Sequence, residues 1–259
     1  MTEIYQEAFG QGEPVVMLHG WAMHTGIWRS FAKALSKEKQ VICMDLPGHG
    51  HSGSISPYTM EVIVDAIHDA LPKQPCIIVG WSLGGNIALR LAEKYPQRVK
   101  SLVLIGSNPH FLQAEQWPGV NAQVLKEFAS NLQKNTTATL LRFMSLQLQG
   151  MADIKVVFKE IKAAMQECEP PKADVLLGGL EILRTVDLRI ALRDLVVPVQ
   201  IILGDLDTLV PVVVGKQCKQ LQSQLEIEVI TRAGHMPFIT HQQQVIRIVN
   251  DFIVRSVTK

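Results

Sequence analysis

The sequence predicts an α/β fold: a mostly parallel, doubly wound β-sheet with an inserted helical cap. Short, nearly uninterrupted apolar runs are the first observation, because strands buried on both faces have this pattern. Helical patterns separate the runs, as βαβ units require. The alternation stops between about residues 111 and 187, where helical patterns continue without a convincing strand.

The apolar runs that predict central strands are residues 15–18, 41–44, 76–79, 102–105 and 199–203. A strand-like segment at 227–230 follows them. The helical patterns between and after the runs cover residues 27–35, 60–71, 86–95 and about 242–254. Strands and helices that alternate at these lengths are typical of a parallel sheet with helices on both faces.

The clearest helix of the inserted block is predicted for residues 153–168, and Pro170-Pro171 ends it. A helical block between two strands of a parallel sheet most simply covers the carboxyl ends of the strands, where such sheets bind ligands. We therefore expect residues 1–110 and 187–259 to form the core and residues 111–186 to form a helical cap (lid).

The composition suits a globular chain with a sizeable core, since 47% of residues are hydrophobic and 19% are charged. A net charge of +1 gives no overall attraction to nucleic acid or anionic lipid, so neither is an expected partner. The amino-terminal residues are acidic rather than signal-like, and no apolar stretch approaches the ~20 residues that span a bilayer. Four scattered cysteines favour a reducing cytoplasm, and we expect a monomer.

A G-x-S-x-G motif is formed by Gly80-Trp81-Ser82-Leu83-Gly84. It follows a predicted strand and precedes a predicted helix, which is the context of a nucleophile elbow. The tight turn holds the serine in a strained conformation, while the flanking glycines let strand and helix approach closely. Ser82 is therefore the candidate nucleophile.

A serine hydroxyl needs a base to take its proton. In chains with such an elbow, the acid and then the histidine follow the serine in sequence order. His235 lies in a turn just after the strand-like segment 227–230 and is the candidate base. Asp205 and Asp207 both follow the strand predicted at 199–203. We favour Asp207 as the acid that orients the imidazole, with Asp205 as the alternative and loop capping as its structural role.

The tetrahedral intermediate of acyl transfer needs two N–H donors for its oxyanion. The amide of Leu83, directly after the nucleophile, is one candidate. The other is the amide of Trp21, because Gly20 allows the loop His19-Gly20-Trp21 to turn toward the carbonyl oxygen. The indoles of Trp21 and Trp81 are candidate pocket walls, although Trp81 is equally typical of a core aromatic, and His19 is expected to order the loop.

The turn Asp45-Leu46-Pro47-Gly48-His49-Gly50 has glycines but lacks the Lys-Ser/Thr of a phosphate loop, so we interpret it as structural. Clustered ligands with metal spacing are also missing from the sequence. We therefore expect no metal and no cofactor.

With these motifs in view, the chain resembles the α/β-hydrolase superfamily throughout. It is more specifically similar to the esterases of biotin synthesis that act on pimeloyl-[acyl-carrier protein] methyl ester. The narrower likeness depends on residues 80–85 and on three segments of the predicted cap, at 117–119, 142–147 and 178–189.

The resemblance implies hydrolysis of this methyl ester to a free acid and methanol, with Ser82, Asp207 and His235 as triad and acyl-carrier protein as partner. The alternative is a short-chain carboxylesterase without carrier recognition. The substrate contacts implied are Trp21, Ser82, Leu83, Phe143, Met144, Ser145, Leu146, Gln147 and His235.

Acyl-carrier proteins are acidic, so a basic face is expected beside the pocket. Lys155, Lys159 and Lys162 recur at helical spacing, and together with Arg142 they are candidates for carrier docking. The related enzymes have mainly arginines at the basic cap positions. Here lysines occupy two of them and Ala138 a third, and lysine lacks the bidentate fork of arginine.

Overall fold

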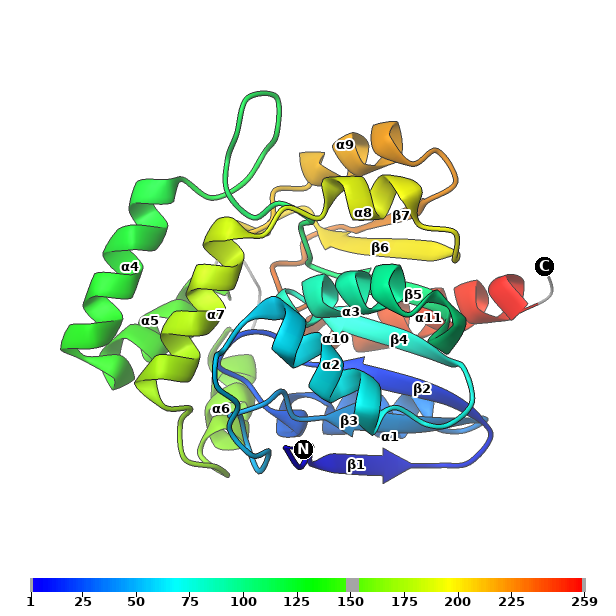
Figure 1. Ribbon diagram of the computed structural model, residues 1–259, viewed down its shortest axis with the longest axis horizontal. Helices are drawn as coiled ribbons and strands as arrows, with labels where there is room; N and C mark the ends of the chain where they lie inside the picture. Colours follow the sequence, from blue (N-terminus) through cyan, green and yellow to red (C-terminus); the bar gives the residue numbers. More distant parts are fainter. Residues whose placement is uncertain (1, 148–153, 258–259) are drawn as a thin grey trace.

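The computed structural model describes residues 2–147 and 154–257, which form a seven-stranded sheet in the order β1-β3-β2-β4-β5-β6-β7 (Figure 1). All neighbouring strands are parallel except the antiparallel pair β1 and β3. The strands are β1 (Gln6–Phe9), β2 (Glu13–Leu18), β3 (Lys39–Met44), β4 (Cys76–Trp81), β5 (Val99–Ile105), β6 (Val199–Gly204) and β7 (Glu226–Ile230).

The strand β1 was not predicted, because its sequence QEAF carries no apolar run and its residues alternate between exposed and half-buried. It pairs along the edge of the sheet, with Gln6 opposite Met44 and Phe9 opposite Val41. An edge strand buries only part of its surface, so the pattern of a fully buried strand is not required of it.

Helices cover both faces of the sheet. Alternate residues of each buried strand point to opposite sides, so each face of the sheet has its own apolar cluster. Val16 and Leu18 belong to one apolar cluster, and Val15 and Met17 to the other. The first cluster takes residues from α2 (Met60–Ala70), α3 (Leu83–Lys94), α8 (Arg189–Asp194) and α9 (Val213–Leu221). The second takes residues from the 3-10 helix η1 (Thr25–Trp28), α1 (Arg29–Leu35), α10 (Pro237–Thr240) and α11 (Gln242–Val257).

The helix α3 begins at Leu83, three residues before the predicted start at residue 86. Its first turn contains Gly84 and Gly85, and two glycines lower helix propensity by about 1 kcal/mol each relative to alanine. This turn packs closely on the end of β2, since a Cβ on Gly84 would collide with the carbonyl oxygen of Leu18. The short η2 (Pro96–Arg98) joins α3 to β5.

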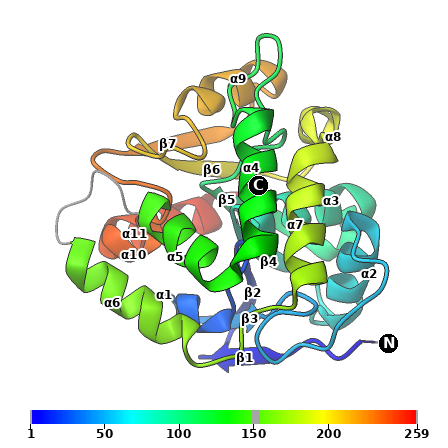
Figure 2. The ribbon, with the colours of Figure 1, turned by 90° about the vertical axis from the view of Figure 1, so that its left-hand side faces the viewer.

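In the part of the chain that the structure describes, four helices lie between β5 and α8, beside one end of the sheet (Figures 1 and 2). They are α4 (Ala122–Lys134), α5 (Thr136–Gln147), α6 (Ile154–Met165) and α7 (Ala173–Thr185). An isolated β-bridge between His110 and Asp187 joins the two ends of this inserted segment. The division into a core and a cap at residues 111–186 stays a prediction.

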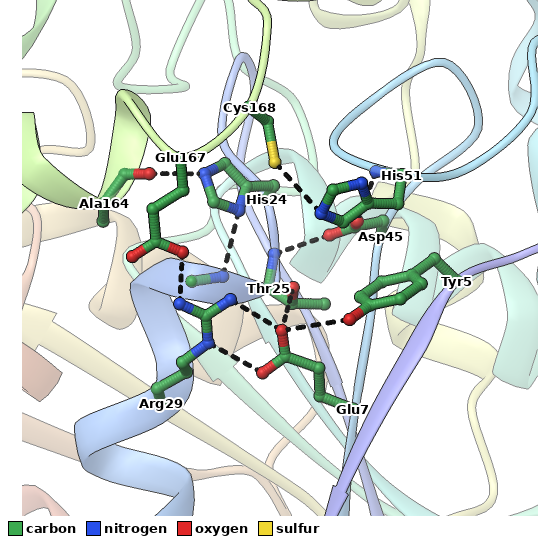
Figure 3. A network of polar contacts seen from close by, with 11 residues as sticks. Tyr5, Glu7, His24, Thr25, Arg29, Asp45, His51, Ala164, Glu167 and Cys168 are labelled. Carbon is green, nitrogen blue, oxygen red and sulfur yellow. Dashed lines mark hydrogen bonds and ion pairs between the residues drawn. The ribbon is translucent and has the colours of Figure 1, made fainter.

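The helix predicted at 153–168 is α6, which ends at Met165, three residues before the predicted end. Asp153 lies outside the described residues. A polar network ties the end of this helix to the core (Figure 3). Arg29 donates from Nε and Nη2 to the carboxylate of Glu7 (2.8 and 2.7 Å) and from Nη1 to Glu167, and His24 Nε2 donates to the carbonyl of Ala164 (2.7 Å).

Over the part of the chain that the structure describes, no helix has the combined length and apolarity that crossing a membrane requires. Cys43, Cys76 and Cys218 are buried as free thiols, and burial raises the pKa of Cys76 and of Cys218 to about 12. Buried neutral thiols of this kind act as small apolar side chains.

Candidate active site

Ser82 forms the sharp turn between β4 and α3. Its φ of 55° lies in the left-handed region, and such a conformation in a residue with a side chain costs about 1–3 kcal/mol. The turn closes only because its neighbours are glycines: a Cβ on Gly80 would lie 2.5 Å from the carbonyl oxygen of Gly84. The motif therefore places Ser82 at the amino-terminus of a twelve-residue helix, as the elbow hypothesis requires.

The backbone of the elbow is held by residues that the sequence interpretation missed. Ser82 N–H donates to the carbonyl of Ile105 at the end of β5 (3.0 Å). The hydroxyl of Ser107 lies 3.0 Å from the carbonyl oxygen of Ser82 and 2.8 Å from Oδ1 of Asn86, so it links the turn to the first part of α3. Ser107 and Asn86 match no short motif, and only the proximity of β5 to α3 identifies them.

His235 and Asp207 are in contact, although they are 28 residues apart: Nδ1 of the imidazole lies 2.7 Å from Oδ2 of the carboxylate. Both side chains are buried. The other carboxylate oxygen accepts the backbone N–H groups of Leu209 (2.8 Å) and Val210 (2.9 Å). The carboxylate is thereby fixed in one orientation toward the ring.

Asp205, the alternative acid, binds a backbone amide of the histidine loop instead of the imidazole. Its Oδ1 accepts the N–H of Arg232 (2.6 Å), a residue with a φ of 62° at the start of the histidine loop. Of the two aspartates it is therefore Asp207 that meets the imidazole, while Asp205 stabilises the turn that carries the histidine.

The hydrogen bond to Asp207 determines which imidazole nitrogen is available. An ionised carboxylate only accepts, so the proton resides on Nδ1 and Nε2 is an acceptor. Nε2 is buried and has no partner among the described residues, and Ser82 Oγ likewise has none there. The ring packs on Gly106, where a Cβ would lie 3.2 Å from Nδ1, and Gly106 follows Ile105, the residue that holds the Ser82 amide.

The two candidate oxyanion donors are also available. Within residues 2–147 and 154–257, neither the N–H of Trp21 nor that of Leu83 donates to any acceptor. The loop that carries Trp21 lies beside the nucleophile, since a Cβ on Gly20 would be 3.3 Å from Cβ of Ser82. The amide of Leu83 is the first of α3, where the helix dipole favours negative charge.

Trp21 connects the site to three inserted helices. Its indole N–H donates to the carbonyl of Leu176 in α7 (2.9 Å), and its ring meets Phe128 of α4 and Phe143 of α5 edge-on, at centroid distances of 5.5 and 5.1 Å. Trp81, in contrast, is packed in the core against Phe238, and its indole N–H donates to the carbonyl of His235 (2.9 Å). Its role here is to hold the histidine loop.

The predicted substrate contacts on α5 differ in their surroundings. Phe143 is half-buried against Trp21, and Met144 is buried in the core. Gln147, one helical turn from Phe143, is 2% exposed, and both its amide nitrogen and its amide oxygen lack partners among the described residues. Ser145 is exposed, with its hydroxyl 3.0 Å from the carbonyl oxygen of Leu141 in the same helix. The side chain of Leu146 lies outside the described part.

The candidate carrier-docking residues lie on α5 and α6. Arg142 is exposed and lines a hollow of about 370 Å³ between α4 and α5, together with Lys134. Lys159 and Lys162 are exposed on α6, and neither they nor Arg142 form an ion pair with a described residue. The side chain of Lys155 lies outside the described part.

Comparison with known proteins gives a consistent result. The family model of the alpha/beta hydrolase fold matches residues 13–242. A curated protein of Methylococcus capsulatus named pimeloyl-[acyl-carrier protein] methyl ester esterase is 38% identical over 253 residues, which cover 98% of this chain and 99% of that protein. Proteins of the same name from Nitrosospira multiformis and Klebsiella pneumoniae are each 35% identical, over 95% and 93% of this chain and 96% and 94% of theirs.

Solved structures share the fold at lower sequence identity. An esterase from Exiguobacterium antarcticum superposes with a TM-score of 0.89 at 22% identity, covering 97% of this chain and 96% of that one. A bromoperoxidase from Bacillus anthracis gives a TM-score of 0.88 at 24% identity, covering 97% and 95%. These two structures differ in activity by name, so the likeness to them establishes the fold alone.

Proposed function

The chain belongs to the α/β-hydrolase fold family and, within it, to the family of the pimeloyl-[acyl-carrier protein] methyl ester esterases, and from this premise we propose its reaction. The chain hydrolyses the methyl ester of pimeloyl-[acyl-carrier protein] to the free acid and methanol, a step of biotin synthesis. The observation that carries the proposal is the buried Nε2 of His235, which has no hydrogen-bond partner among the described residues and belongs to a ring that Asp207 orients beside the elbow of Ser82.

In the proposed mechanism His235 Nε2 takes the hydroxyl proton of Ser82 as its oxygen bonds to the ester carbonyl carbon. The carbonyl oxygen becomes an oxyanion that accepts the N–H groups of Trp21 and Leu83. The imidazolium then protonates the departing methoxide, leaving an acyl-enzyme and methanol. Water attacks the acyl carbon and loses a proton to His235; the imidazolium then protonates the Ser82 oxygen as the acyl–oxygen bond breaks, which regenerates Ser82 and releases the acid. Asp207 stabilises the imidazolium in both steps.

Methanol is a small leaving group, so specificity has to come from contacts along the acyl chain. We propose that Phe143 and Trp21 pack against the methylene chain, since their rings meet edge-on and Trp21 follows Gly20, which packs against Ser82. The amide of Gln147, for which the described residues provide no partner, is proposed to hydrogen-bond the ester or the carrier linkage. Met144, Ser145 and Leu146 complete the proposed contact segment.

We further propose that the acidic carrier docks on the basic residues Arg142, Lys155 and Lys159, and that the enzyme works as a monomer in the cytoplasm. Arg142 and Lys159 are exposed and form no ion pair with the part of the chain that the structure describes, which supports the docking surface, and the buried free thiols suit a reducing compartment. A short-chain carboxylesterase without carrier recognition remains the alternative. It differs in having no preference for the carrier-bound ester.

The central experiment compares Ser82→Ala with a control at the exposed Ser223, Ser223→Ala. Turnover is measured with carrier-bound pimeloyl methyl ester and with a simple nitrophenyl ester, at low salt. We expect Ser82→Ala to lose both activities without unfolding, and Ser223→Ala to retain both. Wild-type protein that hydrolyses only the simple ester would favour the alternative. Activity that survives in Ser82→Ala would refute the mechanism.

Two further readouts separate the proposal from a non-catalytic binding protein built on the same scaffold. A fluorophosphonate should label Ser82 rapidly if an assembled triad activates its hydroxyl. The gene should also rescue growth of a biotin-requiring strain that lacks its own esterase. A wild-type protein that resists the fluorophosphonate would contradict an assembled triad.

A further inference from the structure

A second buried imidazole lies next to the proposed oxyanion site. His19 is 0% exposed and makes two hydrogen-bonded contacts: its Nδ1 lies 2.8 Å from the carbonyl oxygen of Gly20, and its Nε2 lies 2.9 Å from the backbone nitrogen of Leu46. The ring thus joins the loop after β2 to the loop after β3. The proposed mechanism assigns it no proton to transfer.

The two contacts determine the tautomer of His19. The backbone N–H of Leu46 only donates, so Nε2 has to be the acceptor, and the proton therefore resides on Nδ1 and is donated to the Gly20 carbonyl. Burial lowers the pKa of His19 to about 3, which keeps the ring neutral at ordinary pH. Near neutral pH the ring therefore does not change its protonation state, and its two hydrogen bonds do not depend on pH there.

The carbonyl that His19 holds belongs to the peptide unit that carries the Trp21 N–H. A trans peptide unit is planar, and its C=O and N–H point in opposite directions. The Gly20 oxygen also accepts the N–H of Met23 (3.3 Å), so both of its lone pairs are engaged. Fixing this carbonyl on one side fixes the direction of the Trp21 N–H on the other.

The site of the Trp21 N–H agrees with such a role. Gly20 packs against Ser82 and Trp81, and the Trp21 N–H has no acceptor within the described ranges. An N–H held in place beside a nucleophile, with its acceptor position empty, is a preorganised donor for charge that develops during the reaction. Without the shorter contact from His19, only the N–H of Met23 (3.3 Å) would hold the Gly20 carbonyl, and the peptide unit would be less firmly oriented.

We propose that His19 is a positioning residue which, by donating from Nδ1 to the Gly20 carbonyl, aims the Trp21 amide at the oxyanion of the transition state. The inference rests on the proposed function and deepens it, since it assigns a residue outside the triad to the alignment of the oxyanion donor. It also separates the two contacts of His19: only the Nδ1 contact serves catalysis, and the Nε2 contact to Leu46 serves stability.

Two substitutions divide these contacts. The amide of His19→Asn occupies the place of Nδ1, so it retains a donor for Gly20 and loses the acceptor for Leu46. The amide of His19→Gln reaches the place of Nε2, so it retains the acceptor and loses the donor. Loss of an oxyanion donor typically lowers kcat by ~10²–10³. We therefore expect kcat of His19→Gln to fall at least about 10-fold below that of His19→Asn, with similar KM values.

A trifluoromethyl ketone supplies the second readout, because it adds to Ser82 and forms a stable oxyanion. Its inhibition constant should weaken in His19→Gln in parallel with kcat, while thermal unfolding shows both variants to be folded. Equal kcat in the two variants, or a loss that appears in KM alone, would overturn the inference. The simple ester is the substrate in these assays, so the failure of wild-type protein on the carrier-bound ester would count against the proposed function and not against His19.

Discussion

Replacement of Asp207 by asparagine tests the proposed triad most directly. The carboxylate accepts three hydrogen bonds: from His235 Nδ1 (2.7 Å) and from the amides of Leu209 (2.8 Å) and Val210 (2.9 Å). An asparagine oxygen retains the two backbone contacts, because both are made by the same carboxylate oxygen. The asparagine NH₂ then faces Nδ1 as a donor. This donor favours the tautomer with the proton on Nε2, which is unable to accept the proton of Ser82.

The expected effect is on activity far more than on stability. A wrong imidazole tautomer costs on the order of 10⁴ in kcat, which corresponds to about 5.5 kcal/mol of transition-state stabilisation. The one exchanged hydrogen bond is worth about 1 kcal/mol of folding free energy, because the backbone contacts survive. Nitrophenyl ester turnover and urea unfolding of Asp207→Asn measure the two quantities separately.

Asp205→Asn is the matched control. Asp205 holds the same loop through the Arg232 amide, and an asparagine oxygen can still accept that N–H (2.6 Å in the wild type). We expect its kcat to stay within a few-fold of wild type. The assignment of Asp207 would be refuted if Asp207→Asn retained more than a tenth of the wild-type activity. It would also be refuted if Asp205→Asn lost more activity than Asp207→Asn.

Three further predictions concern stability, substrate contact and docking. Burial lowers the pKa of His19 and of His49 to about 3 from an unfolded value of 6.5, so the unfolded state binds more protons than the folded state between pH 3 and pH 6.5. Tm should therefore fall as the pH falls through this window. His49→Gln should make Tm depend less steeply on pH. Gln147→Leu removes two buried polar atoms that have no partner within residues 2–147 and 154–257, so urea unfolding should show unchanged or greater stability while turnover of the carrier-bound ester falls; full activity would contradict a substrate contact. Arg142→Glu with Lys159→Glu should raise KM for the carrier-bound ester by roughly 3- to 10-fold and leave simple-ester kinetics unchanged, whereas equal effects on both esters would exclude docking there.

Local patterns in the sequence predicted the central strands and the candidate site residues of this protein. Uninterrupted apolar runs identified five central strands, because a strand buried on both faces needs apolar residues at every position. The G-x-S-x-G motif singled out Ser82 as the candidate nucleophile, since only glycines tolerate the close approach of Gly80 to Gly84. Chain order behind the elbow reduced the histidine and acid candidates to a few residues.

The contacts between distant residues were decided only by the tertiary structure. The choice between Asp205 and Asp207 depended on the direction of two side chains in one short loop, which periodicity does not encode. The edge strand β1 was missed because pairing along one edge requires no apolar run.

The tautomer of His19, from which its proposed role follows, depended on long-range information of the same kind. Its ring bridges two loops that leave neighbouring strands, and the loops meet only after the sheet has formed. Local sequence patterns indicate the backbone conformation and the burial that each residue favours. The packing of the whole fold determines which side chain accepts the N–H of Leu46, and here that side chain is His19, 27 residues away.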